Sequence, residues 1–145
     1  MSVLPFHFLL LPFWICASEN TLNILFSDEK IEFNPFHTYT STEAQLYSAL
    51  YEGLVSYSPY TLEPVPAAAV SWTVSQNQTV YTFTLRKNGR FWDGTYVTAK
   101  IFRDTWLKML SPEENSSFAF LLDPVKGARA FRNGHSDDPD SVGIR

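Results

Sequence analysis

Cysteine is almost absent from this chain of 145 residues, which contains only Cys16. A single cysteine forms no disulfide within the chain and no cluster of thiolate metal ligands. Histidine is scarce too: the three histidines are His7, His37 and His135, and no two of them have the spacing of zinc ligands. The sequence therefore gives no reason to expect a metal site or a cofactor.

Basic residues are also few, with 11 Lys and Arg against 15 Asp and Glu, which gives a net charge of -4. A nucleic-acid-binding surface needs a basic face, and this charge does not indicate one. The chain lacks the phosphate-binding loop of ATPases and the Gly-x-Ser-x-Gly context of a hydrolase nucleophile. The acidic group Asp137, Asp138 and Asp140 lacks the full ligand series of a calcium loop, so a solvated turn is expected there. We therefore predict a protein that is not an enzyme.

Long hydrophobic runs are absent apart from residues 3–17 at the N-terminus, which are almost wholly apolar. A run of about 15 residues is too short for a membrane-spanning helix of about 20, but it suits the core of a secretory signal peptide. The small residues Cys16, Ala17 and Ser18 follow where a signal peptidase would cut. No Lys or Arg precedes the run and two prolines interrupt it, so a buried N-terminal segment is the alternative.

Residues 1–18 are accordingly predicted to be a signal peptide or a lipoprotein leader. In the second case Cys16 would carry a lipid anchor, although the bulky residues 13–15 fit that interpretation poorly. Either leader would make this an exported protein, periplasmic or at the cell surface.

The clearest pattern of secondary structure lies between residues 70 and 110. Apolar residues alternate at 72 and 74 and again at 81, 83 and 85, which is typical of strands with one buried face. The polar residues 76–79 between them are few enough to form a turn, so a hairpin is predicted over 70–86. Residues 99–110 place Ala99, Phe102, Trp106 and Met109 at steps of three and four, which predicts an amphipathic helix.

The aromatic residues of this region have two interpretations, a buried core or an exposed platform for carbohydrate or peptide. Strand and helix periodicity favours the core for every ring except Trp92, which neighbours a turn. The rings expected in the core are Trp72, Tyr81, Phe83, Phe91, Tyr96, Phe102 and Trp106.

The flanking segments carry weaker signals. Residues 21–26 alternate enough to be a strand, and Thr40 with Glu43 forms a capping-box pattern for a helix running to about Glu52, with Gly53 at its end. Prolines make residues 57–69 extended or irregular. A last short helix is predicted from Pro124 to about residue 133. His37 is expected in a loop, with residues 28 and 32 as its candidate acidic partners.

Several short motifs occur together along the chain: Asn34-Pro35, Glu52-Gly53-Leu54, Phe91-Trp92-Asp93-Gly94 and Val97-Thr98-Ala99. Their order and spacing resemble the bacterial extracellular solute-binding proteins of the oligopeptide and dipeptide type, family 5. The resemblance covers nearly all of this chain but only the first part of the family's length. Ile101 departs from the pattern, because relatives usually carry an acidic residue there, so the start of the helix at residue 99 should be weaker.

The resemblance implies an α/β fold, the N-terminal part of a two-lobed periplasmic-binding-protein-like fold of class II. Residues 19–57 would begin the ligand-binding lobe, and residues 58–145 would form a small α/β subdomain containing the hairpin and the helix. In this family a solute is trapped between lobes that close by a hinge motion. The implied function is the substrate-binding component of an ABC-type peptide importer, with permease subunits as partners. The resemblance does not identify the solute, since peptides, nickel chelates, haem and sugars are all bound within the superfamily.

The resemblance also implies where ligand would be contacted. The loop after Asn34-Pro35 lines the cleft in peptide-binding relatives, and it corresponds here to Thr38, Tyr39, Thr40 and Ser41. Its main chain would pair with an extended peptide, which is recognition by strand addition. Phe118 matches a segment where relatives tend to carry an aromatic residue, but it lacks the hydroxyl of a tyrosine. The alternative is that both segments are ordinary loop and core residues with no role in ligand binding. The alternative function is a small secreted module that binds carbohydrate or protein through exposed aromatic residues of the hairpin.

The predicted leader can be tested on protein isolated from the native host. Because the apolar run is short and ends in small residues, we expect cleavage near Ala17 or Ser18. Mass spectrometry should then find an N-terminus close to Glu19. An intact Met1 on cytosolic protein would contradict the prediction, and a diacylated Cys16 would replace it with the lipoprotein interpretation.

Overall fold

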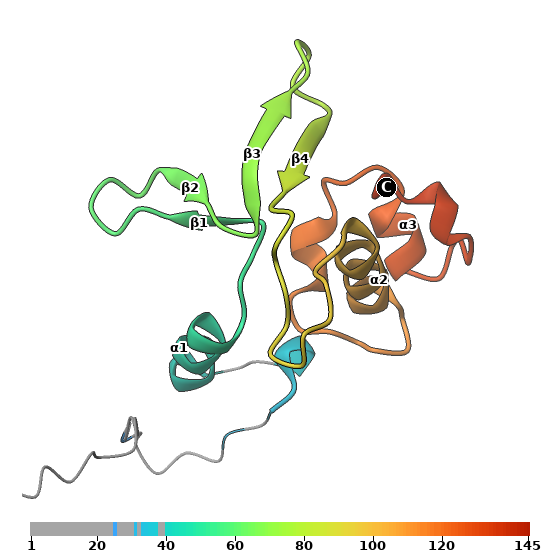
Figure 1. Ribbon diagram of the computed structural model, residues 1–145. Helices are drawn as coiled ribbons and strands as arrows, with labels where there is room; N and C mark the ends of the chain where they lie inside the picture. Colours follow the sequence, from blue (N-terminus) through green and yellow to red (C-terminus); the bar gives the residue numbers. More distant parts are fainter. Residues whose placement is uncertain (1–24, 26–30, 32, 38–39) are drawn as a thin grey trace, which may run out of the picture.

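The computed structural model describes residues 25, 31, 33–37 and 40–145. The predicted leader lies outside these residues, as does the predicted strand at 21–26 apart from Leu25. Figure 1 shows α1 and the β1–β2 hairpin on one side of the β3–β4 hairpin, with α2 and α3 on the other. The elements are η1 (Pro35–His37), α1 (Ser41–Leu50), β1 (Val55–Tyr57), β2 (Pro64–Pro66), β3 (Ala69–Val74), β4 (Tyr81–Leu85), α2 (Ala99–Leu110), η2 (Ala119–Leu122), α3 (Ala128–Arg132) and η3 (Pro139–Ser141).

The predicted hairpin is confirmed as the antiparallel pair β3–β4. Trp72 lies opposite Phe83, and the centroids of their rings are 6.5 Å apart. At the turn the amide of Ser75 donates to the carbonyl of Val80 at 2.9 Å, and Gln78 has a positive φ of 58°. The polar residues between the strands therefore form the turn that the sequence predicts.

A second antiparallel pair joins β1 to β2, with Val55 opposite Pro66 and Tyr57 opposite Pro64. Prolines in a sheet are confined to places where their missing N–H group is not needed, and β2 is such an edge strand. The extended conformation expected around these prolines is confirmed. The subdomain boundary placed between residues 57 and 58 stays a prediction, and β1 and β2 pair across it.

The capping box of α1 is confirmed: the Thr40 hydroxyl accepts from the amide of Glu43 at 3.1 Å, and the Glu43 carboxylate accepts from the amide of Thr40 at 3.2 Å. The helix ends at Leu50, before the predicted end at Glu52. Contacts with residues distant in sequence explain this earlier end of the helix. Arg86 binds the Glu52 carboxylate, and the amide of Ala68 donates to the carbonyl oxygen of Gly53. These contacts hold the chain extended beyond Leu50.

Helix α2 has the bounds that its pattern predicts, Ala99–Leu110. Its N-cap residue Thr98 makes no side-chain cap hydrogen bond, and the first turn contains no acidic residue. This agrees with the weaker start expected from Ile101. None of the helices in the part of the chain that is described is long and apolar enough to cross a membrane.

The core differs from the predicted one. Its main cluster of buried residues consists of Leu110 of α2, Ala128 of α3, and Val142 and Ile144 of the segment after η3. Trp106 packs against this cluster but is only half-buried. The prediction that aromatic rings form the centre of the core is therefore wrong. A two-stranded hairpin has no second layer to cover its rings. Half-buried rings are Trp72, Phe83, Phe102 and Trp106, and exposed rings are Tyr81, Phe91, Tyr96 and, as predicted, Trp92.

The last helix is shorter than predicted, because α3 begins at Ala128 and not at Pro124. Gly127 has a φ of 75°, a left-handed conformation that a continuing right-handed helix does not contain. A Cβ at Gly127 would lie 2.3 Å from the carbonyl oxygen of Ser141. Residues 142–144 form no helix or strand and pack irregularly against the core, with the Gly143 amide donating to the carbonyl oxygen of Lys126 at 2.8 Å.

The close approach at Gly127 predicts a large effect of Gly127→Ala. Adding a Cβ combines an unfavourable left-handed residue with a clash against backbone, so the free energy of unfolding should fall by more than about 2 kcal/mol. Gly134→Ala is the matched control, because Gly134 has a φ of 69° but open space where the Cβ would be. It should cost about 1 kcal/mol. Urea denaturation of both variants tests this, and equal losses would contradict the importance of the contact.

Candidate functional site

Three of the predicted ligand-contact residues can be located. Thr40 is the N-cap of α1 and Ser41 is its first, exposed residue, whereas Thr38 and Tyr39 lie outside the described residues. Phe118 directly precedes η2, and 43% of its surface is exposed. Its ring lies beside that of Phe120, with the centroids 6.3 Å apart.

Hydrogen bonds to Phe36 bring the two predicted segments together. The carbonyl oxygen of Phe36 accepts from the amide of Ser117 at 3.0 Å and from the hydroxyl of Ser116 at 2.8 Å. Phe36 lies two residues before the predicted contact Thr38, and Ser117 lies directly before Phe118. Segments about 80 residues apart in the sequence are therefore joined at the candidate site, which we call the Phe36 clamp.

Charged contacts surround the Phe36 clamp. His37 Nε2 lies 3.4 Å from Oε1 of Glu114, and Lys108 Nζ lies 3.7 Å from the other oxygen of the same carboxylate. The Lys108 ammonium also lies over the Phe36 ring, 5.4 Å from its centroid. Glu114 was not predicted as a partner of His37, since no local sequence pattern relates residues so far apart. The acidic residues expected as partners, at 28 and 32, lie outside the described residues.

The hydroxyl of Ser117 is a buried polar atom that has no hydrogen-bond partner in the described structure. Leaving such a group unsatisfied costs about 1–3 kcal/mol. The hydroxyl both donates and accepts, and it lies between the Phe36 clamp and the exposed ring of Phe118. Because the oxygen is buried, it offers no surface to a ligand in this conformation.

The other end of η2 is fixed by Asp123. Arg132 donates to both carboxylate oxygens of Asp123 at 2.9 Å, and Arg129 donates at 3.3 Å. The hydrogen bonds from Arg132 hold the pKa of Asp123 below its ordinary value. Because η2 begins directly after Phe118, these ion pairs help to fix the position of its ring.

The chemistry available at the candidate site is that of binding. It offers backbone groups near α1 and the exposed ring of Phe118, while His37 and Lys108 contact Glu114. Across the described ranges, no group of three or more His, Cys, Asp or Glu side chains is arranged to hold a metal ion.

A groove of about 970 Å³ lies elsewhere, between β4 and α2. It also reaches Leu122, residues 124–126 and residues 143–145, and of the predicted contacts that the structure describes, none lines it. We refer to it as the β4–α2 groove. The residues that define it here are Tyr81, Thr82, Phe83, Phe102, Trp106 and Arg145.

Comparison with known families gives one match to a sequence profile, "Bacterial extracellular solute-binding proteins, family 5 Middle", over residues 63–144. The chain is 33% identical to the periplasmic murein peptide-binding protein MppA of Escherichia coli over 132 residues, which are 90% of this chain and 24% of MppA. It is 32% identical to the dipeptide-binding protein DppE of Bacillus subtilis over 124 residues, 86% of this chain and 23% of DppE.

Two solved structures show the same fold. The unliganded open form of MppA superposes with a TM-score of 0.73 at 34% identity, covering 81% of this chain and 23% of that one. The Haemophilus influenzae OppA complex with the peptide RPPGFSPFR superposes with a TM-score of 0.72 at 29% identity, covering 78% and 22%. The predicted α/β fold, part of a two-lobed class II binding protein, is thereby confirmed. The chain spans about a quarter of the length of these relatives.

The Phe36 clamp predicts a specific effect of Glu114→Gln. Losing the charge weakens the contacts to His37 and Lys108, and exposed or partly exposed ion pairs contribute about 0.5–1 kcal/mol. Hydrogen exchange at the Ser117 amide, which donates to Phe36, should therefore accelerate about two- to fivefold. Glu113→Gln is the control, because the adjacent Glu113 is exposed. Equal exchange in the two variants would show that Glu114 does not support the clamp.

Proposed function

The chain belongs to the bacterial extracellular solute-binding proteins of family 5, and we propose that it forms the N-terminal part of the substrate-binding component of an ABC-type peptide importer. It would capture peptides outside the cytoplasmic membrane and deliver them to permease subunits. The observation that carries this proposal is the Phe36 clamp, which joins the two segments where ligand contact is expected.

Three relatives support peptides as the solute. MppA is named for murein peptides, DppE is named for dipeptides, and the OppA of Haemophilus influenzae was solved with a peptide of nine residues. These ligands differ widely in length and side chains. A site made largely of backbone groups suits such variety, because main-chain hydrogen bonds do not depend on the ligand's sequence.

The described groups suggest how a peptide would be held. The Thr40 hydroxyl already accepts from the Glu43 amide, so residues 38–41 would contact the ligand mainly through their main chain. The exposed ring of Phe118 would cover apolar parts of the peptide. No cofactor enters this proposal, because binding and release require none.

Export is part of the same proposal. The family consists of extracellular or periplasmic binding proteins, which fits the leader predicted over residues 1–18. A lipid anchor on Cys16 would hold the protein at the membrane surface near its permease partners. A cleaved signal peptide would instead release it into the periplasm.

The alternative, a carbohydrate- or protein-binding module, draws less support from the aromatic residues. Trp72 and Phe83 of the hairpin pack against each other and are half-buried. The most exposed rings, Trp92 at 98% and Tyr60 at 94%, lie in different loops, the first between β4 and α2 and the second between β1 and β2. They do not form one continuous platform.

The proposal predicts that peptide binding requires the second lobe. Residues 38–41 alone would give a few hydrogen bonds worth about 1 kcal/mol each, against the entropic cost of association. Calorimetry of the 145-residue chain with a mixed tripeptide library should therefore show millimolar or weaker affinity. A chimera in which this chain replaces the matched part of Escherichia coli MppA should bind with micromolar affinity.

The contribution of Phe118 is tested in the same chimera. Phe118→Ala should weaken binding about tenfold, a loss of about 1.4 kcal/mol. Phe120→Ala is the control, since Phe120 is an exposed neighbour outside the predicted contacts. Micromolar binding by the isolated chain, or equal losses in the two variants, would contradict the proposed site.

A further inference from the structure

The loop of residues 87–96, which we call the basic–aromatic loop, presents three exposed rings within six positions. Trp92 is 98% exposed, Tyr96 52% and Phe91 43%. Figure 1 shows this loop in yellow, between the end of β4 and the start of α2. Single exposed apolar residues are ordinary on a protein surface, but a group of them in one short loop is typical of a surface that binds another molecule.

The backbone of the basic–aromatic loop is fixed by hydrogen bonds within the loop. The amide of Phe91 donates to the carbonyl oxygen of Thr95 at 2.8 Å, and the amide of Gly94 donates to the carbonyl oxygen of Phe91 at 3.0 Å. Arg90 donates to the carbonyl oxygen of Gly94 at 2.7 Å, and its guanidinium lies 3.6 Å from the centroid of the Tyr96 ring. The loop therefore loses little backbone freedom when a partner covers it.

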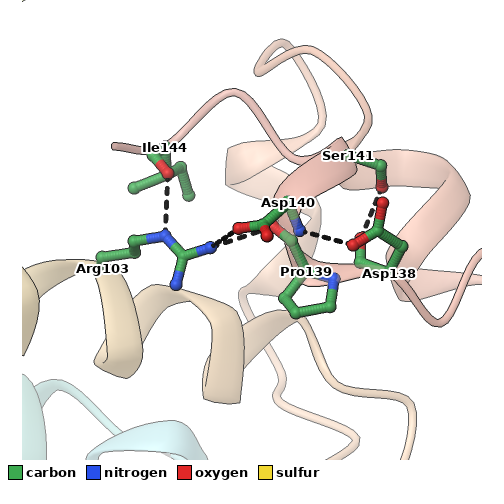
Figure 2. Close-up of polar contacts among 6 residues, drawn as sticks. All are labelled: Arg103, Asp138, Pro139, Asp140, Ser141 and Ile144. Carbon is green, nitrogen blue, oxygen red and sulfur yellow. Dashed lines mark hydrogen bonds and ion pairs between the residues drawn. The ribbon is translucent and has the colours of Figure 1, made fainter.

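The same loop carries cations that have no acidic partner. The chain contains 11 Lys and Arg, of which Lys30 lies outside the described residues, and six of the other ten form ion pairs. Figure 2 shows one of these pairs, between Arg103 and a carboxylate of η3. Among the described residues, neither Lys87 nor Arg90 pairs with a carboxylate, and both are exposed. Since Asp93 is the only acidic residue of the loop, its local charge is positive on a chain that is acidic overall.

Exposed rings beside unpaired cations fit the surface of a membrane that contains anionic lipids. Tryptophan and tyrosine are enriched at the membrane–water interface, because each combines an apolar ring with a polar N–H or O–H group. Each Lys or Arg near an anionic lipid surface adds to the attraction. A small ligand would instead need a hollow, and no residue of the loop lines the β4–α2 groove.

We propose that the basic–aromatic loop contacts the surface of a membrane containing anionic phospholipids. Trp92 inserts among the headgroups, while Lys87 and Arg90 face the lipid phosphates. The contact orients the protein on the membrane and does not involve the solute. It relies on the proposed function only for the location of the protein outside the cytoplasmic membrane. Failure of the peptide titrations would therefore leave it unaffected.

The test follows the fluorescence of Trp92 in the 145-residue chain. The probes are vesicles of phosphatidylglycerol and phosphatidylcholine in equal amounts, with bromine atoms near the headgroup end of the acyl chains, which quench a tryptophan inserted beside them. Trp14→Phe is introduced throughout, because Trp14 belongs to the apolar N-terminal run, which would itself bind vesicles. We expect quenching that decreases as salt is raised and that is weaker with phosphatidylcholine alone.

Two lysine variants test the role of charge. Lys87→Gln should lower the ratio of quenched to unquenched Trp92 about fivefold at a fixed lipid concentration, because one cation beside the lipid is lost. Lys126→Gln is the matched control: Lys126 is also exposed and without an ion pair among the described residues, but it lies outside the loop. It should leave the ratio unchanged. Circular dichroism establishes that both variants are folded.

Relocating the tryptophan tests whether the contact is specific to this loop. Combining Trp92→Phe with Tyr60→Trp places the indole in the loop between β1 and β2, where Tyr60 is 94% exposed. Most of the quenching should then be lost, because the remaining tryptophans of the described structure, Trp72 and Trp106, are half-buried.

Several outcomes would overturn the proposal. These are the absence of Trp92 quenching, equal quenching by phosphatidylcholine alone, equal effects of the two lysine variants, and equal quenching of the relocated tryptophan. A change of Trp92 emission with a chitin oligosaccharide but not with vesicles would assign the loop to a glycan instead.

Discussion

Burial of the segment after η3 against the end of α2 is the interaction on which the rest of the structure depends. Val142 and Ile144 close the cluster around Leu110, and they reach it because Gly127 lets the backbone of Ser141 approach. A large side chain typically stabilises a fold by about 1.5–3 kcal/mol when it is fully buried. Figure 1 shows the β1–β2 and β3–β4 hairpins extending away from this helical centre.

The candidate site takes its geometry from that centre. Helix α2 carries Lys108, which with His37 flanks Glu114, and α3 carries Arg132, which holds Asp123 at the end of η2. Both ion-pair groups lie within a few residues of Phe118. The Phe36 clamp then attaches the N-terminal segment to the same loop through backbone and hydroxyl groups. Core packing thereby determines where two distant segments meet.

Local sequence patterns predicted local structure well. The errors arose where contacts between residues distant in sequence determine the ends of helices or the burial of side chains. Period-two alternation identified the β3–β4 hairpin, and the Thr40 capping box identified the start of α1, because both depend on neighbours in sequence. The end of α1 depends instead on Arg86, and the start of α3 on the approach of Ser141 to Gly127. Periodicity likewise shows which face of a strand is apolar but not whether anything covers it, so the aromatic core was misplaced. The predicted contacts at 38–41 and at Phe118 came from family resemblance, and sequence alone gave no sign of the clamp between them.

The charges around the clamp bear on selectivity. The Glu114 carboxylate contacts both His37 and Lys108, so it is engaged within the protein. The groups left at the predicted contacts are backbone groups and the apolar ring of Phe118, which carry no charge that would distinguish an acidic from a basic side chain. Specificity is a difference between affinities, and it requires a group that favours one ligand or penalises another. In the proposed binding component, discrimination by charge would therefore come from residues outside these predicted contacts.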